Sequence, residues 1–359
     1  MDRIVSIASI DSTLQVPPRC TFDIDDWKLM AQYWYPIALA SGVSEQPTSA
    51  MLLDEPLVLY KVGEEIIVAR DVCPHRGVPL SLGTPDGEGI RCRYHGLRFG
   101  AGGQCNHIPA NPGRPIPKKL HLRTYPSVER YGLIWTCLAR ANQTVDVAAV
   151  HAELPVMPYW DHEGFQQIVC PTFDVAGFAG RQLEGFIDVA HFGWVHTATF
   201  GDPNDTEVPE YTTTETETGF NADYRSFIGN YPIGSSQRGQ SGFEWLRHFE
   251  VHLPFTATLT VHFPDRGKLV IMNAACPVSA RQTRLFAPIA RNFDLDIPVE
   301  AVHEFNLRVF EEDRLVVETQ KPEWLPLDPS SEGHILADRS SLAYRKGLRK
   351  LGFSAFFSA

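Results

Sequence analysis

Two short motifs in the chain pair a cysteine with a histidine. They are Cys73-x-His75 and Cys92-x2-His95, with sixteen residues between them. Each follows a β-rich run and lies where a turn is expected. Two thiolates and two imidazoles that arrive from paired hairpins suit a [2Fe–2S] cluster, with the cysteines on one iron and the histidines on the other. Such ligands raise the reduction potential from roughly −400 mV to between about −150 and +300 mV.

A zinc site is the main alternative for these four residues. Known Cys2His2 zinc spacings pair cysteine with cysteine and histidine with histidine, whereas each half here contributes one of each. Cys105 and His107 form another Cys-x-His pair, but no second Cys-x2-His follows, so we interpret them as loop residues near the cluster. The remaining cysteines are typical of small buried side chains: Cys20, Cys137, Cys170 and Cys276.

A second group of metal-binding side chains lies in residues 181–198, which the pattern predicts as a helix. Because each helical residue rotates by about 100°, Glu184, Asp188 and His191 would share one face. His196 follows His191 by five residues and would point away from it on a regular helix. Both can bind one ion only if the helix widens or ends between them. The alternative is two unrelated histidines on an aromatic helix.

A third ligand is predicted in the helix expected at 298–321. Asp313 lies in the middle of the apolar stripe of this helix, and a lone buried carboxylate is costly unless it is paired or coordinated. With His191 and His196 it would complete the two-histidine, one-carboxylate triad of non-haem Fe(II) oxygenases, which leaves positions open for O2. The alternative is an ion pair between Asp313 and a buried arginine such as Arg181.

Residues that could border the substrate are expected on the same helix. Asn306 and Phe310 lie within two turns before Asp313 on its face, so we expect them beside the open iron positions. The strands expected at 242–275 carry further aromatic side chains, for which core packing is the more common role. The sequence does not name the substrate.

The elements that must position these residues fall into two groups. Residues 51–138 show short β-rich runs separated by turns, and 100–117 is rich in glycine and proline and is expected to be loop. Long strands over 211–290 are followed by helices, which predicts an α+β protein. The expected division is an N-terminal extension at 1–29, an all-β cluster domain at 30–145 and an α+β iron domain at 150–359.

The composition is that of an acidic globular protein. The length of 359 residues suits two domains, and 32 basic against 43 acidic residues give a formal net charge of −11. This balance argues against nucleic-acid binding through a general basic surface. No apolar run approaches the ~18–20 residues of a membrane helix, and no signal peptide is recognised, so we expect a cytoplasmic protein. A Gly-rich stretch at 100–105 lacks the last glycine of a dinucleotide fingerprint, so a separate reductase is expected.

From about Trp34 to Leu351 the chain resembles the Rieske non-haem iron oxygenases. It is most similar to their short demethylase and monooxygenase branch, the type of caffeine N-demethylase and dicamba O-demethylase. Where the family often has proline and tryptophan beside the second cluster motif, this chain has Arg93 and Leu97. The segments that carry the resemblance are Cys73-Pro-His75-Arg-Gly, Cys92-Arg-Tyr-His95-Gly, Glu129-Arg-Tyr-Gly-Leu-Ile-Trp135, Asp188-x2-His191-x4-His196 and Glu311-Glu-Asp313-Arg-Leu-Val-Val-Glu318.

The resemblance implies a Rieske domain, a helix-grip catalytic domain of the START/Bet v 1-like kind, and a homotrimer. It implies one [2Fe–2S] cluster and one mononuclear non-haem Fe(II) per chain, with electrons from an NAD(P)H-dependent reductase, with or without a ferredoxin. Asp188 would accept a hydrogen bond from His191. In the family resembled, its second oxygen meets a cluster histidine of the neighbouring subunit, which here would be His95.

The expected function is O2-dependent monohydroxylation or oxidative N- or O-demethylation of an aromatic or heterocyclic small molecule. Hydroxylation of a methyl carbon on oxygen or nitrogen gives a hemiacetal-like species that loses formaldehyde. The alternatives are a cis-dihydroxylating ring dioxygenase, a Rieske electron-transfer protein, and a protein that only binds an apolar ligand. An electron carrier would hold two irons per chain and an oxygenase three.

Overall fold

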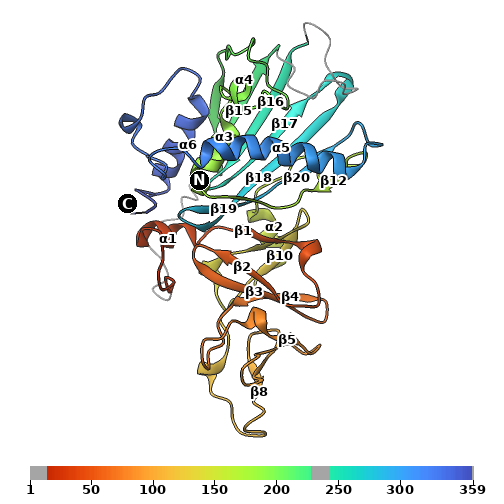
Figure 1. Cartoon of the computed structure of the whole chain (residues 1–359), viewed down its shortest axis with the longest axis vertical. Coiled ribbons are helices and arrows are strands. Elements are labelled where there is room, and N and C mark those ends of the chain that lie inside the picture. Colours follow the sequence, from red (N-terminus) through yellow and green to blue (C-terminus); the bar gives the residue numbers. More distant parts are fainter. Residues whose placement is uncertain (1–13, 228–242, 358–359) are drawn as a thin grey trace. The chain divides into compact units, whose positions relative to one another are not determined.

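The computed structural model describes residues 14–227 and 243–357, which form two compact units that divide between Leu154 and Pro155 (Figure 1). The first unit is mostly short strands, and the second combines one large sheet with helices. The predicted α+β class is confirmed. No helix among the residues that the structure describes combines the length and apolar character needed to cross a membrane.

The first unit contains three small antiparallel sheets among its described residues, with strand orders β1-β11-β10, β2-β3-β4-β9 and β5-β6-β7-β8. The last sheet carries the second cluster motif. Its strand β8 corrects one expectation, because it lies in the stretch 100–117 that was predicted as loop and pairs with β7. The strands are β1 Tyr35–Leu39, β2 Thr48–Leu52, β3 Glu55–Val62, β4 Glu65–Arg70, β5 Thr84–Pro85, β6 Ile90–Arg91, β7 Arg98–Phe99, β8 Cys105–His107, β9 Thr124–Tyr125, β10 Ser127–Arg130 and β11 Leu133–Thr136.

Helix α1 (Ile24–Met30) ties the start of the described chain to the first unit. The Asp23 carboxylate caps it by accepting hydrogen bonds from the backbone N–H groups of Asp25 and Asp26. The buried Trp27 indole donates to the Leu53 carbonyl at 2.8 Å. This part of the predicted N-terminal extension therefore packs within the first unit. The other helical segments of the unit are α2 Val147–Glu153 and the 3₁₀ turns η2 Ala40–Gly42, η3 Leu80–Leu82, η4 Lys118–Leu120 and η5 Leu138–Arg140.

The second unit is built on a large antiparallel sheet of order β12-β20-β18-β17-β16-β15-β14, to which β19 and β13 add beside β18. Burial alternates along β16, as a sheet with two different faces requires. At the end of the range 211–290, where long strands were expected, the chain forms two short strands, β19 and β20, separated by Ala287. The strands are β12 Gln166–Val169, β13 Phe173–Val175, β14 Thr212–Glu215, β15 Gly219–Ser226, β16 Trp245–His252, β17 Thr256–His262, β18 Lys268–Ser279, β19 Gln282–Phe286 and β20 Pro288–Arg291.

Two helices cover the same face of this sheet. The residues Phe249, Leu259, Ile271 and Ile289 lie directly opposite one another on four neighbouring strands, so they share a face. The Phe186 ring of α3 contacts the first of them, and α5 packs against the last through Phe310. The helical segments are α3 Ala179–Ile187, α4 Phe192–Val195, α5 Val299–Val317, α6 Arg339–Lys350 and the 3₁₀ turns η6 Pro264–Arg266 and η7 Pro329–Ser331.

Candidate metal centres

The two cluster motifs form turns with the same hydrogen bonds. The backbone N–H of Cys73 donates to the Val78 carbonyl, and the Cys73 carbonyl accepts from Gly77. The second turn repeats this pattern between Cys92, Leu97 and Gly96. Both glycines have positive φ, 75° and 67°, a conformation that L side chains rarely adopt. Each motif thus presents its cysteine and histidine from an equivalent tight turn.

The side chains of the two turns meet and fit a [2Fe–2S] cluster. The thiols of Cys73 and Cys92 are buried and interact with each other, and the rings of His75 and His95 lie 4.6 Å apart. Burial raises the pKa of Cys73 to about 11, so a bound cation is needed to hold the thiolate at neutral pH. His75 Nδ1 is buried and meets no hydrogen-bond partner within the described part of the chain, as expected for a metal-binding nitrogen.

The residues beside the cluster motifs take different positions. Leu97 is buried and its carbonyl supports the second turn, whereas Arg93 is exposed. Cys105, expected in a loop, begins strand β8 and is buried in the same hydrophobic cluster as the cysteines of the motifs. Burial raises the pKa of its thiol, and its Sγ lies 3.8 Å from the carbonyl of His107.

The helix predicted at 181–198 is wrong as a single element. Helix α3 ends at Ile187, because Asp188 has an extended backbone with φ −77° and ψ 129°. A separate four-residue helix, α4, has His191 at its N-cap and His196 at its C-cap. The two histidines therefore bracket one helical turn, in which Val195 and His196 donate to the carbonyls four residues earlier, so the helix break lies before His191 and not between the histidines as predicted.

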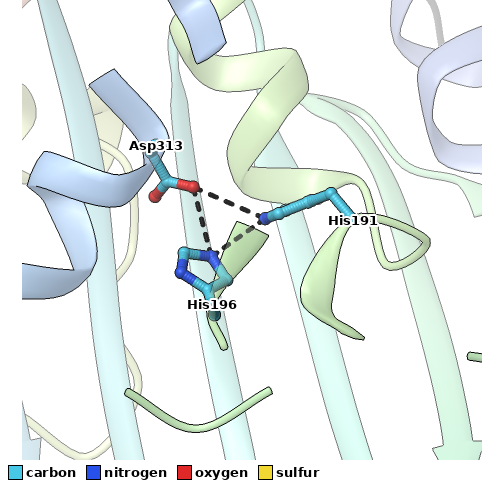
Figure 2. Close-up of side chains that lie close together, drawn as sticks. All are labelled: His191, His196 and Asp313. Carbon is cyan, nitrogen blue, oxygen red and sulfur yellow. Dashed lines mark hydrogen bonds and ion pairs between the residues drawn. The ribbon is translucent and has the colours of Figure 1, made fainter. Parts of the chain in front are cut away.

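Figure 2 shows His191, His196 and Asp313 pointing toward one another. The two Nε2 atoms lie 3.0 Å apart, and Asp313 Oδ1 lies 3.2 Å from His196 Nε2 and 3.5 Å from His191 Nε2. One ligand atom from each residue lies within 4.8 Å of the others, a spacing that one ion can span. Two imidazoles and one carboxylate on a single side are the donor set of a non-haem Fe(II) site.

The protonation states of these residues depend on one another. Burial acts to lower the pKa of His191, but hydrogen bonds and charges from Asp188 and Asp313 outweigh it and raise this pKa to about 9. Burial acts to raise the pKa of Asp313, yet the two histidines lower it. A cation bound here would replace the imidazole proton as the partner of the carboxylate.

Asp188 lies beside His191, although not for the predicted reason. Because α3 ends before Asp188, the two residues do not share a face of one helix; the turn between the helices brings them together. Asp188 Oδ2 lies 3.5 Å from His191 Nδ1, and its Oδ1 accepts the Ala190 N–H at 2.8 Å. Glu184, grouped with them in the prediction, points elsewhere.

Glu184 belongs to a buried ion network, defined here as Arg181, Glu184, Glu332 and Arg345. Arg345 donates to both oxygens of Glu184 at 2.6 and 2.8 Å, and Arg181 and Arg345 each donate to Glu332 at 2.6 Å. The proposed alternative for Asp313, an ion pair with Arg181, is therefore wrong, since Arg181 is engaged with the two glutamates.

The two residues expected to border the iron lie on the predicted helix. Asn306 is buried and its amide donates to the Val302 carbonyl one turn earlier. Phe310 packs in a core cluster and its ring lies 5.9 Å from that of Phe173. Their contact with a substrate stays a prediction.

Sequence reasoning missed Glu312. Its Oε2 lies 2.8 Å from His196 Nδ1, on the side of the ring that faces away from the metal-binding nitrogen. The available signal was its place directly before Asp313 in an acidic run.

Comparison with known proteins agrees with this geometry. Residues 33–126 match the Rieske [2Fe–2S] domain, and residues 180–352 match the vanillate O-demethylase oxygenase C-terminal domain. The methylxanthine N1-demethylase NdmA of Pseudomonas putida is 32% identical over 348 residues, 93% of this chain and 94% of that protein. The dicamba O-demethylase oxygenase component of Stenotrophomonas maltophilia is 45% identical over 103 residues, 28% of this chain and 30% of that protein.

The fold is shared with solved structures of such enzymes. The structure of Pseudomonas putida CBB5 NdmA with caffeine superposes with a TM-score of 0.78 at 28% identity, covering 93% of this chain and 98% of that one. Dicamba monooxygenase, at 21% identity and a TM-score of 0.75, shows the same fold over 90% of this chain and 97% of that one. The chain therefore belongs to the Rieske non-haem iron oxygenases and is an oxygenase component with a Rieske [2Fe–2S] cluster and a mononuclear iron.

Proposed function

We propose that this oxygenase removes a methyl group from oxygen or nitrogen of an aromatic or heterocyclic small molecule, as N- or O-demethylation. The convergence of His191, His196 and Asp313 carries the proposal, because an electron carrier needs no such site. Relatives named as methylxanthine, dicamba and vanillate demethylases support the reaction class. Asn306 and Phe310 are the proposed substrate contacts.

We assign the cluster to Cys73, His75, Cys92 and His95. The thiols lie in the core and the imidazoles nearer the surface, with His95 exposed. When bound, the cluster delivers single electrons and the mononuclear iron activates O2 next to the substrate. The chain itself positions the ligands. Asp188 orients His191 through Oδ2, and its Oδ1 accepts the Ala190 N–H in the turn between α3 and α4.

Several finer features belong to the same proposal. The protein is a cytoplasmic homotrimer that receives electrons from a separate NAD(P)H-dependent reductase, with or without a ferredoxin. Asp188 connects the iron site to His95 of the partner subunit. The proposed domain limits are 30–145 and 150–359. The two units of the described chain divide after Leu154, which supports a domain boundary close to residues 145–150.

A reconstituted assay tests the proposal. The purified chain is combined with a surrogate reductase, NADH and O2, and methylated aromatic and heterocyclic compounds are screened. Demethylation releases one formaldehyde per substrate consumed, whereas a ring dioxygenase would give a cis-diol without formaldehyde. Three irons per chain are expected; two irons and no substrate-dependent O2 uptake would identify an electron carrier instead.

A further inference from the structure

Glu312 binds the segment that follows α4 at two points. Its Oε2 lies 2.8 Å from His196 Nδ1 and 2.6 Å from Thr199 Oγ1. A carboxylate oxygen only accepts, so the imidazole N–H and the hydroxyl both donate to it. Helix α5 thus approaches the His196 ring on two sides, with Glu312 at Nδ1 and Asp313 at Nε2.

An ordinary ion pair does not explain this carboxylate. The neighbouring Arg314 pairs with Glu311 and Glu318 instead. The Glu312 side chain is 16% exposed, and its Oε1 is buried and accepts no hydrogen bond from the described residues. Because burying a carboxylate is costly without partners, the two donors on Oε2 are what holds it in place.

The His196 ring is held on its other sides as well. The side chain is 2% exposed, and the Phe200 ring stacks on it at 4.5 Å between centroids and 29° between planes. The His196 carbonyl accepts from three successive backbone N–H groups, those of Thr199, Phe200 and Gly201. Rotation of the ring would break its stacking on Phe200 and its hydrogen bond to Glu312, while the three backbone hydrogen bonds fix the main chain that carries it, so Nε2 is held toward the other two metal ligands.

The second imidazole is held less firmly. Asp188 Oδ2 lies 3.5 Å from His191 Nδ1, a longer separation than the 2.8 Å at His196, and its side chain is 31% exposed. The other Asp188 oxygen accepts the Ala190 N–H. The two histidine ligands therefore differ in how strongly the protein positions them.

We propose that Glu312 is a positioning residue for the iron site. By accepting from Nδ1–H it keeps His196 in the tautomer whose Nε2 lone pair is free for the metal, and Thr199 keeps the carboxylate in place. The inference rests on the proposed function, since it assumes that His196 Nε2 binds the iron. Groups that orient a metal-bound imidazole in this way contribute roughly 10- to 100-fold to metal affinity.

The test measures Fe(II) affinity rather than turnover. The mononuclear iron is removed by a mild chelator while the cluster absorption is monitored, and Fe(II) is titrated back anaerobically. Glu312→Ala should raise the Fe(II) dissociation constant by about 10- to 100-fold, and Glu312→Gln should raise it less, because the Gln amide oxygen can still accept from Nδ1–H. Thr199→Val should raise it less, and Thr199→Ser, which keeps the hydroxyl, should restore the wild-type value.

Glu311→Gln is the matched control, because it changes the adjacent exposed carboxylate, which pairs with Arg314 on the same helix. A purely structural role of Glu312 would lower the thermal midpoint of the iron-depleted protein and leave its Fe(II) affinity unchanged. A dissociation constant within twofold of wild type in Glu312→Ala would overturn the proposal.

If Glu312→Ala does not fold, as judged by the absence of a cooperative thermal transition of the second unit, the Thr199 pair decides. A wild-type protein that binds no third iron would instead overturn the proposed function, and this inference with it.

Discussion

Glu184→Gln should destabilise helix α3 strongly, because it removes one charge from the buried ion network. Glu184 accepts from Arg345 Nε and Nη2 at 2.6 and 2.8 Å and lies 3.3 Å from Arg181 Nη1. The arginine side chains are each 4% exposed and Glu184 is 10% exposed. In the variant, two buried guanidinium groups would share the single carboxylate of Glu332, so one positive charge would stay buried without a counter-charge from Glu184.

The magnitude follows from this burial. Removing one partner of a buried ion pair costs about 3–5 kcal/mol, because the remaining charge stays desolvated. The same substitution at an exposed pair costs about 0–1 kcal/mol. Glu323→Gln is the matched control, since Glu323 pairs with Arg281 at 2.7 Å and their side chains are 42% and 59% exposed.

Native-state hydrogen exchange of the α3 amides measures the effect locally, without assuming that the two units unfold together. Since 1.4 kcal/mol is a factor of ten, α3 should open about two to four powers of ten more often in Glu184→Gln. The Rieske absorption should not change, because the cluster motifs lie in the other unit. Exchange no faster than in Glu323→Gln would refute the reasoning.

Further predictions address the metal sites and the dependence on pH. Cys92→Ser should abolish the visible absorption of the cluster, and His191→Ala should lose one of three irons and all turnover while that absorption stays normal. Asp188→Asn should keep its metals, yet its pre-reduced cluster should fail to support single-turnover oxidation with substrate and O2; a normal rate would limit Asp188 to a local role. The hydrogen bond to Glu250 raises the pKa of His248 from 6.5 to about 9, burial opposes this, and Asp223 adds to it. Because the folded pKa is the higher one, the protonated His248 stabilises the fold fully below pH 6.5, and this stabilisation is lost as the pH rises through 9. The midpoint of urea unfolding should therefore fall over this pH range in the wild type and should fall less in His248→Gln.

The meeting of the candidate ligands was predictable where the chemistry is local in sequence. The cluster motifs each pack a cysteine and a histidine into one turn, so their spacing alone defines the donor set. Asp313 was predictable because α5 runs unbroken from Val299 to Val317, which keeps its helical phase valid over the whole stripe.

Other parts depend on contacts that no local pattern records. The residue types around Asp188 do not indicate the extended backbone that ends α3, so the predicted single helix was wrong there. Glu312 reaches His196 across 116 residues of sequence, and Arg345, which pairs with both oxygens of Glu184, lies on α6. Strand β8 was missed because its pairing with β7 outweighs the low strand propensity of a glycine-rich stretch.

The four-residue helix between the histidines restricts how this segment can diversify. Insertion or deletion of one residue in α4 would turn His196 by about 100° and shift it by about 1.5 Å, away from the shared point. Substitution is restricted as well, since a Cβ at Gly201 would lie 2.1 Å from the Phe192 carbonyl oxygen and one at Gly193 would lie 2.9 Å from that of Asp202. Side-chain libraries aimed at new substrates should therefore be placed outside residues 191–201, on the sheet or on positions of α5 other than Glu312 and Asp313, and length variants should avoid α5 because it carries the third candidate ligand.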